Sequence, residues 1–206
     1  MASKQSLSEK YQHKNEKEHI LDNPDTYIGS VENVDENVYV FENNTIVSKQ
    51  ISYNPGLFKL FDEGIVNCRD HFIRMMNIED SEKVTQINIS IENGKFTLYN
   101  NGNGIDVEKH PDLDVWIPEL IFGHLRTSTN YNKKEKKITG GKNGFGFKLV
   151  LIWSTFGEIE TVDHIRGLKY YQKFENNLEV IHKPKITKCK SKPYTKVSFI
   201  PDYLRL

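Results

Sequence analysis

Residues 138–154 read ITGGKNGFGFKLVLIWS, a glycine-rich turn that runs directly into an apolar segment. Its four glycines allow consecutive backbone N–H groups to converge, and residues 147–155 predict a buried helix that begins at this turn. Lys148 falls in the first turn of that helix and adds a formal positive charge. Two interpretations fit the stretch alone: a loop that wraps phosphates, or a flexible connection to a core helix.

The common nucleotide-binding fingerprints are not present around these glycines. Gly141 and Gly146 have the spacing of a P-loop, but Phe-Lys follows them instead of Lys-Ser or Lys-Thr. The dinucleotide pattern G-x-G-x-x-G fails at Gly102 and again at Gly144. A nucleotide site in this chain therefore has to be argued from other residues.

The strongest helix prediction covers residues 57–77. Its polar side carries Glu63, Asn67, Asp70 and His71, of which Glu63 and Asn67 are one turn apart and project in the same direction. A carboxylate suits water activation and an amide oxygen suits Mg²⁺. The alternative is a solvated helix face, but lysine or glutamate usually fills such a face, so this set of residues favours a site. The opposite, apolar side is predicted to consist of Phe61, Ile65, Cys68 and Phe72.

A change to period-two alternation after residue 85 predicts a β-hairpin. Ile87, Ile89 and Ile91 alternate with polar residues, and Asn93-Gly94 supplies the turn. The hairpin runs into NNGNGI at 100–105, which is either a closing turn or a place where the backbone approaches a flat ligand. Asn100 would then present a donor and an acceptor to a base edge.

The remaining pattern predicts a single α+β domain. A short helix is expected before Pro24 and another in residues 113–126, and the polar stretch 127–146 has the length of a functional loop or lid. Further strands are expected at 158–162, 169–174, 179–182 and 195–200. Together they predict a mostly antiparallel sheet with helices on one face, spanning residues 11–206 after a loose N-terminus at 1–10.

Composition narrows the class of protein. The 206 residues are 37% hydrophobic and carry 28 basic and 28 acidic side chains. The chain therefore lacks the excess of basic residues that a protein usually needs to bind nucleic acid on its own. Two cysteines imply no disulfide framework. The polar start MASKQSLSEK is not a secretory signal, and no apolar run is long enough to cross a bilayer. We expect an intracellular protein.

Several motifs in order resemble one family. The acid and asparagine on a helix, the strand-terminal N-x-G-x-G, a long loop and the glycine-rich turn resemble the ATP-binding fold of the GHKL superfamily. EHILDNPDTYIGSVE, PGLFKLFDEGIVN, LIFGHLRTSTNY and KKITGGKNGFGFKL are similar to the ATPase domain of eukaryotic and large-DNA-virus type II DNA topoisomerases. The resemblance runs from about Tyr11 to the C-terminus.

The resemblance implies a role for each matching residue. Glu63 would be the general base for ATP hydrolysis, and Asn67 would bind Mg²⁺ and phosphate oxygens. Asn100 would hydrogen-bond adenine, and Thr195 would hold adenine through water. Lys148 would balance the phosphate charge. The other implied ATP-binding residues are Gly102, Gly104, Ile105, Ser128, Thr129, Asn130, Gly141, Lys142, Asn143, Gly144, Phe145 and Gly146.

The family also implies partners and further domains. It acts as a nucleotide-dependent homodimer through its N-terminal gate, and it contacts DNA through domains that we expect to be absent from this chain: the transducer with its γ-phosphate lysine, the TOPRIM region and the DNA gate. The protein would then be nuclear in a eukaryote, or located in the host cell or virion for a virus. His71, Arg69 and Phe147 depart from the family pattern.

Two other functions remain open from the sequence. One is another GHKL ATPase, of the MutL or chaperone type. The other is a nucleotide-sensing module that binds ATP without hydrolysing it.

Overall fold

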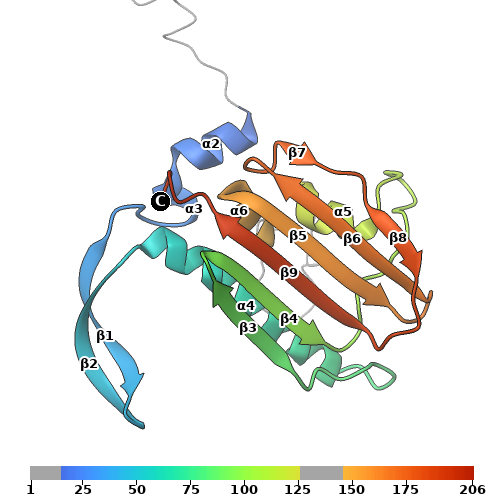
Figure 1. The fold of residues 1–206 in the computed structure, drawn as a ribbon, viewed down its shortest axis with the longest axis horizontal. Coiled ribbons are helices and arrows are strands. Elements are labelled where there is room, and N and C mark those ends of the chain that lie inside the picture. The colour runs from blue at the N-terminus through green and yellow to red at the C-terminus, as the bar shows by residue number, and fades with distance from the viewer. Residues whose placement is uncertain (1–14, 126–145) are drawn as a thin grey trace, which may run out of the picture.

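The computed structural model describes residues 15–125 and 146–206, which form an α+β fold. A seven-stranded antiparallel sheet carries helices on one face, and a separate two-stranded sheet projects from its side (Figure 1). The helices are α2 (Glu16–Asp22), α3 (Pro24–Tyr27), α4 (Pro55–Met76), α5 (Ile117–Gly123) and α6 (Gly146–Ile152). The predicted fold class is therefore confirmed.

The large sheet has the strand order β3-β4-β9-β5-β6-β7, with β8 also paired to β6. Strands distant in sequence are neighbours in it, because β9 lies between β4 and β5. Its strands are β3 (Ile87–Glu92), β4 (Lys95–Asn101), β5 (Ser154–Asp163), β6 (Leu168–Glu175), β7 (Val180–Ile181), β8 (Lys185–Lys188) and β9 (Tyr194–Pro201).

The predicted hairpin at residues 87–98 is confirmed as β3 and β4. Asn93 and Gly94 occupy the turn with φ of 51° and 76°, the positive values that a two-residue hairpin turn requires. The register pairs Ile91 with Phe96 and Ile87 with Asn100. The hairpin thus delivers Asn100 to the end of β4.

The apolar helix that follows the glycines is confirmed, but it ends earlier than the predicted residue 155. It ends at Ile152, and Ser154 already pairs with Pro201 as the first residue of β5. All six residues from Phe147 to Ile152 are buried. An apolar sequence alone does not distinguish a buried helix from the buried strand that continues it, which explains the error.

Helix α4 confirms the predicted helix at 57–77, although its buried side differs from the prediction. Leu60, Gly64 and Cys68 are buried, whereas Phe61, Ile65 and Phe72 are only partly buried. Gly64 explains the difference, because a Cβ placed there would lie 3.0 Å from Leu98 Cδ1. A glycine at the centre of the helix lets the core approach its backbone closely.

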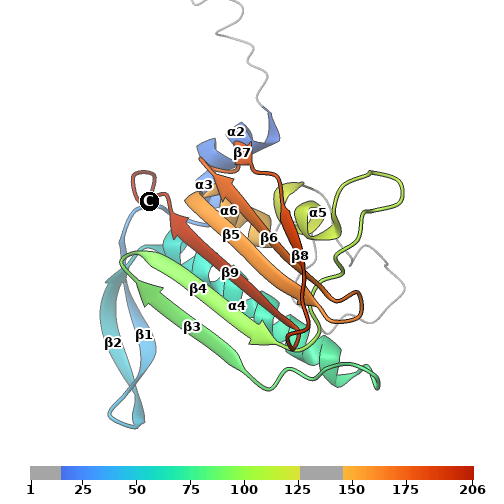
Figure 2. The same cartoon turned by 45° about the vertical axis from the view of Figure 1, so that its right-hand side comes forward.

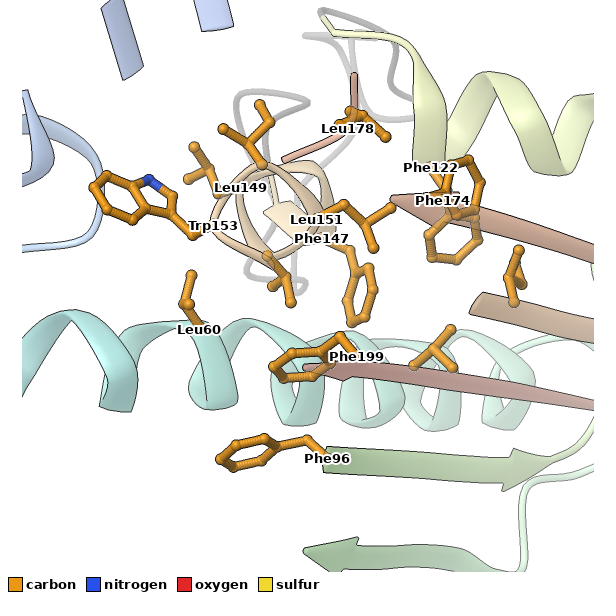
Figure 3. Packing of buried hydrophobic residues seen from close by; sticks show 14 of the residues in the cluster. Leu60, Phe96, Phe122, Phe147, Leu149, Leu151, Trp153, Phe174, Leu178 and Phe199 are labelled. Atoms are coloured by element: carbon orange, nitrogen blue, oxygen red, sulfur yellow. The ribbon is translucent and has the colours of Figure 1, made fainter. Parts of the chain in front are cut away.

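The core is built around α6, which lies beside α4 and α5 and packs against β5 and β9 (Figure 3). Phe199 of β9 is fully buried and stacks on Phe96 of β4, with ring centroids 5.1 Å apart. Phe147 of α6 meets Phe199 edge-on at 5.8 Å and meets Phe122 of α5 edge-on at 5.4 Å. These rings join α5, α6 and two central strands in one cluster.

Three parts of the fold were not predicted from the sequence: the one-turn helix α3, the short edge strand β8, and the projecting hairpin of β1 (Val34–Glu42) and β2 (Thr45–Tyr53). The hairpin pairs Val34 with Tyr53 and stands apart from the large sheet in both views (Figures 1 and 2). Close to its turn, Tyr39, Phe41 and Ile46 are 70% or more exposed. The hairpin contributes little to the core.

We expect Phe199→Ala to lower the free energy of unfolding by about 3–5 kcal/mol, because it removes a buried ring that contacts two others. Urea denaturation followed by circular dichroism measures this. Phe41→Ala is the matched control: its ring is 73% exposed, so the expected change is within about 0.5 kcal/mol. Equal losses for the two variants would show that the core is not centred on Phe199.

Candidate functional site

The two polar residues predicted on α4 converge with the start of α6. A Cβ placed at Gly146 would lie 3.6 Å from Glu63 Oε2 and 3.9 Å from Asn67 Nδ2. Glu63 and Asn67 are one turn apart on α4, and burial of α6 holds Gly146 opposite them. The arrangement places a carboxylate and an amide beside the backbone that follows the glycine-rich turn.

Glu63 is oriented by a neighbour that the sequence analysis did not single out. Lys59 Nζ lies 2.7 Å from Glu63 Oε1, one helical turn earlier, and 3.3 Å from Asp62. The hydrogen bond to Glu63 raises the pKa of Lys59, so the lysine stays charged. With Oε1 held by Lys59, Oε2 is the oxygen that faces Gly146.

Asn67 is positioned by its own helix. Its Nδ2 donates a hydrogen bond of 2.7 Å to the backbone carbonyl of Glu63, which fixes the side chain alongside the carboxylate. That bond does not use the amide oxygen, the atom that would serve as a hard ligand for Mg²⁺. Among residues 15–125 and 146–206, no group of three or more His, Cys, Asp or Glu side chains is placed to hold a metal ion.

Lys148 lies in the first turn of α6 and only 3% of it is exposed. Burial lowers the pKa of its ammonium group to about 8. A phosphate placed beside it would favour the charged form again. The position therefore suits a lysine that balances bound anionic charge.

The other end of the site is a row of polar side chains across three neighbouring strands. Asn100 of β4 pairs with Thr195 of β9, and Thr195 pairs with Thr161 of β5. Residues directly opposite each other in a sheet share a face, so these three project together toward the helices. Asn100 is buried, and its Nδ2 donates 3.0 Å to the carbonyl of Asn101.

Thr161 is the hydrogen-bonding centre of this row, and the sequence analysis missed it. Its hydroxyl donates 2.9 Å to the carbonyl of Tyr194 and accepts 3.0 Å from the N–H of Ile105. Because its proton is used, the hydroxyl of Thr195, 3.0 Å away, is the donor between the two threonines. Thr195 then keeps acceptor capacity for water or a ligand, as its expected role requires.

The glycines after β4 are required by contacts within the protein. A Cβ at Gly104 would lie 1.9 Å from the carbonyl oxygen of Val162, so no larger residue fits. Gly102 has φ of +96°, and a Cβ there would lie 2.6 Å from Val84 Cγ2. The predicted close backbone approach exists, but the observed contacts are with the chain's own strand and side chains.

The segment after Gly104 is tied to the end of β5. The N–H of Val107 donates 2.9 Å to Asp163 Oδ2, and Arg166 bonds Asp163 at 2.9 Å and Asp106 at 2.7 Å. Arg166 also pairs with Glu108. These contacts hold Ile105, a predicted site residue, next to Thr161.

The departures from the family pattern have structural explanations. Phe147 is 8% exposed and points into the core, so its bulk is accommodated away from Glu63. His71 lies against the segment that follows β4, where its Nε2 is 3.3 Å from a Cβ placed at Gly102. Burial lowers the pKa of His71. Arg69 is exposed, with Nη1 3.6 Å from Asp70 Oδ1.

Eight predicted site residues lie outside the described part of the chain. The structure brings together Glu63, Asn67 and Gly146 at one end of the site, with Lys148 two residues further along α6, and Asn100, Ile105 and Thr195 at the other end. The eight outside are Ser128, Thr129, Asn130, Gly141, Lys142, Asn143, Gly144 and Phe145.

The described residues fit a nucleoside triphosphate with a divalent cation. The Glu63 carboxylate and the Asn67 amide lie near Gly146, and the buried Lys148 follows two residues later in α6. The Thr195 hydroxyl and the buried Asn100 amide lie near the ends of their strands. Anionic phosphates suit the first group and a base edge suits the second. No helix in the described part of the chain is long and apolar enough to span a membrane.

Comparison with known proteins gives consistent results, although no protein-family model matches the chain. It is 46% identical over 204 residues to DNA topoisomerase 2 of Acanthamoeba polyphaga mimivirus and 47% identical over 203 residues to that of Saccharomyces cerevisiae. These matches cover 96% and 97% of the chain but only 16% and 14% of the relatives.

Solved structures agree with these relatives. The ATPase region of Saccharomyces cerevisiae topoisomerase II superimposes with a TM-score of 0.89 at 45% identity, covering 97% of this chain. The ATPase and transducer domains of DNA topoisomerase II from Balamuthia mandrillaris give 0.91 at 38% identity, covering 98% of it. The chain spans 52% of each of those two structures.

The shifted pKa of Lys148 gives a pH test of its burial. An unfolded lysine titrates at about 10.4, so between about pH 8 and that value the unfolded state binds more protons than the folded state. This lysine therefore makes the free energy of unfolding rise with pH across that window. We expect Lys148→Met to be more stable than the parent chain at neutral pH, and its advantage to shrink as pH rises through the window.

Urea denaturation of both chains at several pH values measures this difference. Lys49→Met, at an exposed lysine of the projecting hairpin, is the control and should show a difference that does not change with pH. A pH-independent advantage of Lys148→Met would contradict the assignment of a depressed pKa to Lys148.

Proposed function

The chain is homologous to the ATPase region of type II DNA topoisomerases, and from this premise we propose that it binds ATP with Mg²⁺ and hydrolyses it. The observation that supports this most directly is the convergence of Glu63 and Asn67 on Gly146. The relatives and solved structures compared above are type II topoisomerases, so a MutL-like or chaperone-like ATPase is not favoured.

Glu63 is the proposed general base. Its Oε2 faces Gly146, and a water molecule between them would be oriented for in-line attack on the terminal phosphorus. The carboxylate accepts the proton of that water as the new P–O bond forms. Lys59 acts through Glu63 as a positioning residue, since it holds the other carboxylate oxygen.

The phosphates would be held by Lys148 and by the backbone around Gly146, with Gly141–Phe145 contributing as the sequence predicts. When bound, Mg²⁺ would neutralise phosphate charge, with the amide oxygen of Asn67 as the ligand from this chain. Ser128, Thr129 and Asn130 are proposed to contact ribose and phosphates.

Adenine would lie against the polar row at the ends of β4, β9 and β5. Asn100 would bond the base edge directly, and Thr195 would reach it through water. Thr161 and Gly104 set the position of Ile105 against that row. The protein would thus supply a preformed base site whose polar groups are already oriented.

In a longer protein we propose that this region drives nucleotide-dependent homodimerisation and DNA strand passage, as expected of a type II topoisomerase inside the cell. DNA-stimulated turnover by such a longer protein would separate this function from a nucleotide-sensing module.

Calorimetric titration of the 206-residue chain with a non-hydrolysable ATP analogue, with and without Mg²⁺, is the first test of the site. Saturable binding that Mg²⁺ strengthens supports the proposal, and Asn67→Ala should remove the Mg²⁺ effect.

Glu63→Gln tests the role of the base. We expect ATP hydrolysis by the full enzyme to fall by more than about 100-fold, because the amide cannot accept a proton, while analogue affinity changes little. Steady-state phosphate release and calorimetry measure the two quantities. Turnover that survives the substitution would remove Glu63 from the mechanism.

Lys59→Met tests the positioning residue. We expect kcat to fall by about tenfold or more while nucleotide affinity is retained, because the carboxylate loses the contact that orients it. Lys59→Arg should restore most of the rate, since arginine can make the same pair. An unchanged kcat in Lys59→Met, or equal losses in both variants, would contradict this role.

A further inference from the structure

The buried amide of Asn100 has two opposite groups to offer a bound base. An asparagine side chain carries an acceptor oxygen and a donor nitrogen, and a half-turn of the amide exchanges their places. A purine with an amino group at position 6 needs the acceptor, whereas a purine with a carbonyl group there needs the donor. Which base the site takes therefore depends on what holds the amide of Asn100 in one orientation.

A main-chain carbonyl group fixes this orientation. Asn100 is 5% exposed, and its Nδ2 donates 3.0 Å to the carbonyl oxygen of Asn101. Within the part of the chain that the structure describes, no donor bonds Asn100 Oδ1, and this oxygen is not among the fully enclosed atoms without a partner. It is therefore an accessible acceptor. Turning the amide over would break the Nδ2 bond and place Oδ1 against the carbonyl oxygen.

The side chain of Asn101 holds that carbonyl group from the opposite face of the sheet. Successive residues of a strand point to opposite faces, so Asn101 projects away from the helices while Asn100 projects toward them. Asn101 Oδ1 accepts 2.9 Å bonds from the N–H groups of Thr85 and Gln86. Its Nδ2 donates 2.8 Å to Thr85 Oγ1. Asn101 is thus placed to orient Asn100 without touching a bound base.

The neighbouring threonine does not supply the donor that Asn100 withholds. Thr161 donates its proton to the carbonyl of Tyr194. It accepts from the N–H of Ile105 and from the hydroxyl of Thr195, which fills its one donor and two acceptor positions. The proton of Thr195 is therefore committed to Thr161. Thr195 and Asn100 both offer oxygen acceptors on the helix-facing side of the sheet.

Closure of the hairpin end explains only part of this arrangement. The bonds from Asn101 to Thr85 and Gln86 fix the chain where it enters β3, and a structural role needs nothing more. The bond from Asn100 to the Asn101 carbonyl is not required for that purpose, and it uses one donor of a buried amide. Its effect is to leave the Asn100 oxygen as the group that meets a ligand.

We propose that Asn101 is a specificity-determining residue: by holding the amide of Asn100 in one orientation, it makes the base site select a 6-aminopurine over a 6-oxopurine. This inference rests on the proposed nucleotide function and deepens it, since it names a residue that decides which triphosphate binds. The 6-amino group of adenine donates to Asn100 Oδ1. The 6-carbonyl group of hypoxanthine or guanine would set a second acceptor against that oxygen.

Calorimetric titration with two matched analogues tests the inference. The β,γ-imidotriphosphates of adenosine and inosine, each with Mg²⁺, differ only at position 6 and in the proton on N1. The ratio of their dissociation constants therefore isolates the contact at this edge of the base. We expect the 206-residue parent chain to favour the adenosine analogue by about 100-fold. In Asn101→Ala the ratio should fall to about tenfold or less, because the released amide can turn over and donate to the 6-carbonyl group.

Further variants separate this role from a structural one. Asn101→Asp keeps an acceptor for the N–H groups of Thr85 and Gln86, so it should retain the parent ratio. Asn100→Asp, measured at pH 8 where the carboxylate is ionised, has no donor end to turn toward the base. Adding Asn101→Ala to Asn100→Asp should therefore leave the ratio unchanged. Asn37→Ala, on the exposed side of β1, is the control and should leave both affinities unchanged.

Each way of failing gives a different result. Equal binding of both analogues by the parent chain would overturn this inference and leave the proposed ATP site in place. An unchanged ratio in Asn101→Ala, or an equal fall in the Asn100→Asp background, would limit Asn101 to a structural role. If Asn101→Ala does not fold, Asn100→Asp alone decides: a ratio far above that of the parent would show that the parent amide already turns over. Binding of neither analogue would contradict the proposed function, and this inference with it.

Discussion

The complete burial of α6 is the constraint on which the site depends. Its side chains are packed by α4, α5 and the sheet, so the helix cannot move without opening the core. Gly146 is therefore fixed opposite Glu63 and Asn67, and Lys148 is fixed inside. Gly64 contributes from the other side, because its missing side chain lets the core reach the α4 backbone.

The polar groups of the site are oriented by the protein itself. Lys59 holds one oxygen of Glu63, Asn67 is bonded to its own helix, and Thr161 sets the direction of the Thr195 hydroxyl. Groups that are already aligned do not have to be ordered when a ligand binds, and this favours both affinity and rate. The arrangement buries the ammonium group of Lys148, and this desolvation lowers its pKa.

The sequence predicted those parts of the structure that depend on local patterns. Period-two alternation with Asn93-Gly94 located the β3–β4 hairpin, and motif order placed Glu63 and Asn67. Thr161 could not be found this way, since its importance comes from β9 lying between β4 and β5, a non-local pairing. Lys59 has the ordinary appearance of a surface lysine. The β1–β2 hairpin did carry a signal, since segments rich in β-branched and aromatic residues flank Asn43-Asn44, where both residues have positive φ.

The β1–β2 hairpin has a consequence for how the molecule fluctuates. An isolated two-stranded sheet is marginally stable in water, and this one has exposed apolar side chains at its tip and no layer packed beneath them. Its amide hydrogens should exchange with solvent through local opening, at a free energy far below that of global unfolding. The buried amides of α6 and β9 exchange only when the core opens. The domain thus combines a rigid core around the proposed nucleotide site with an arm that can fold and unfold without disturbing it.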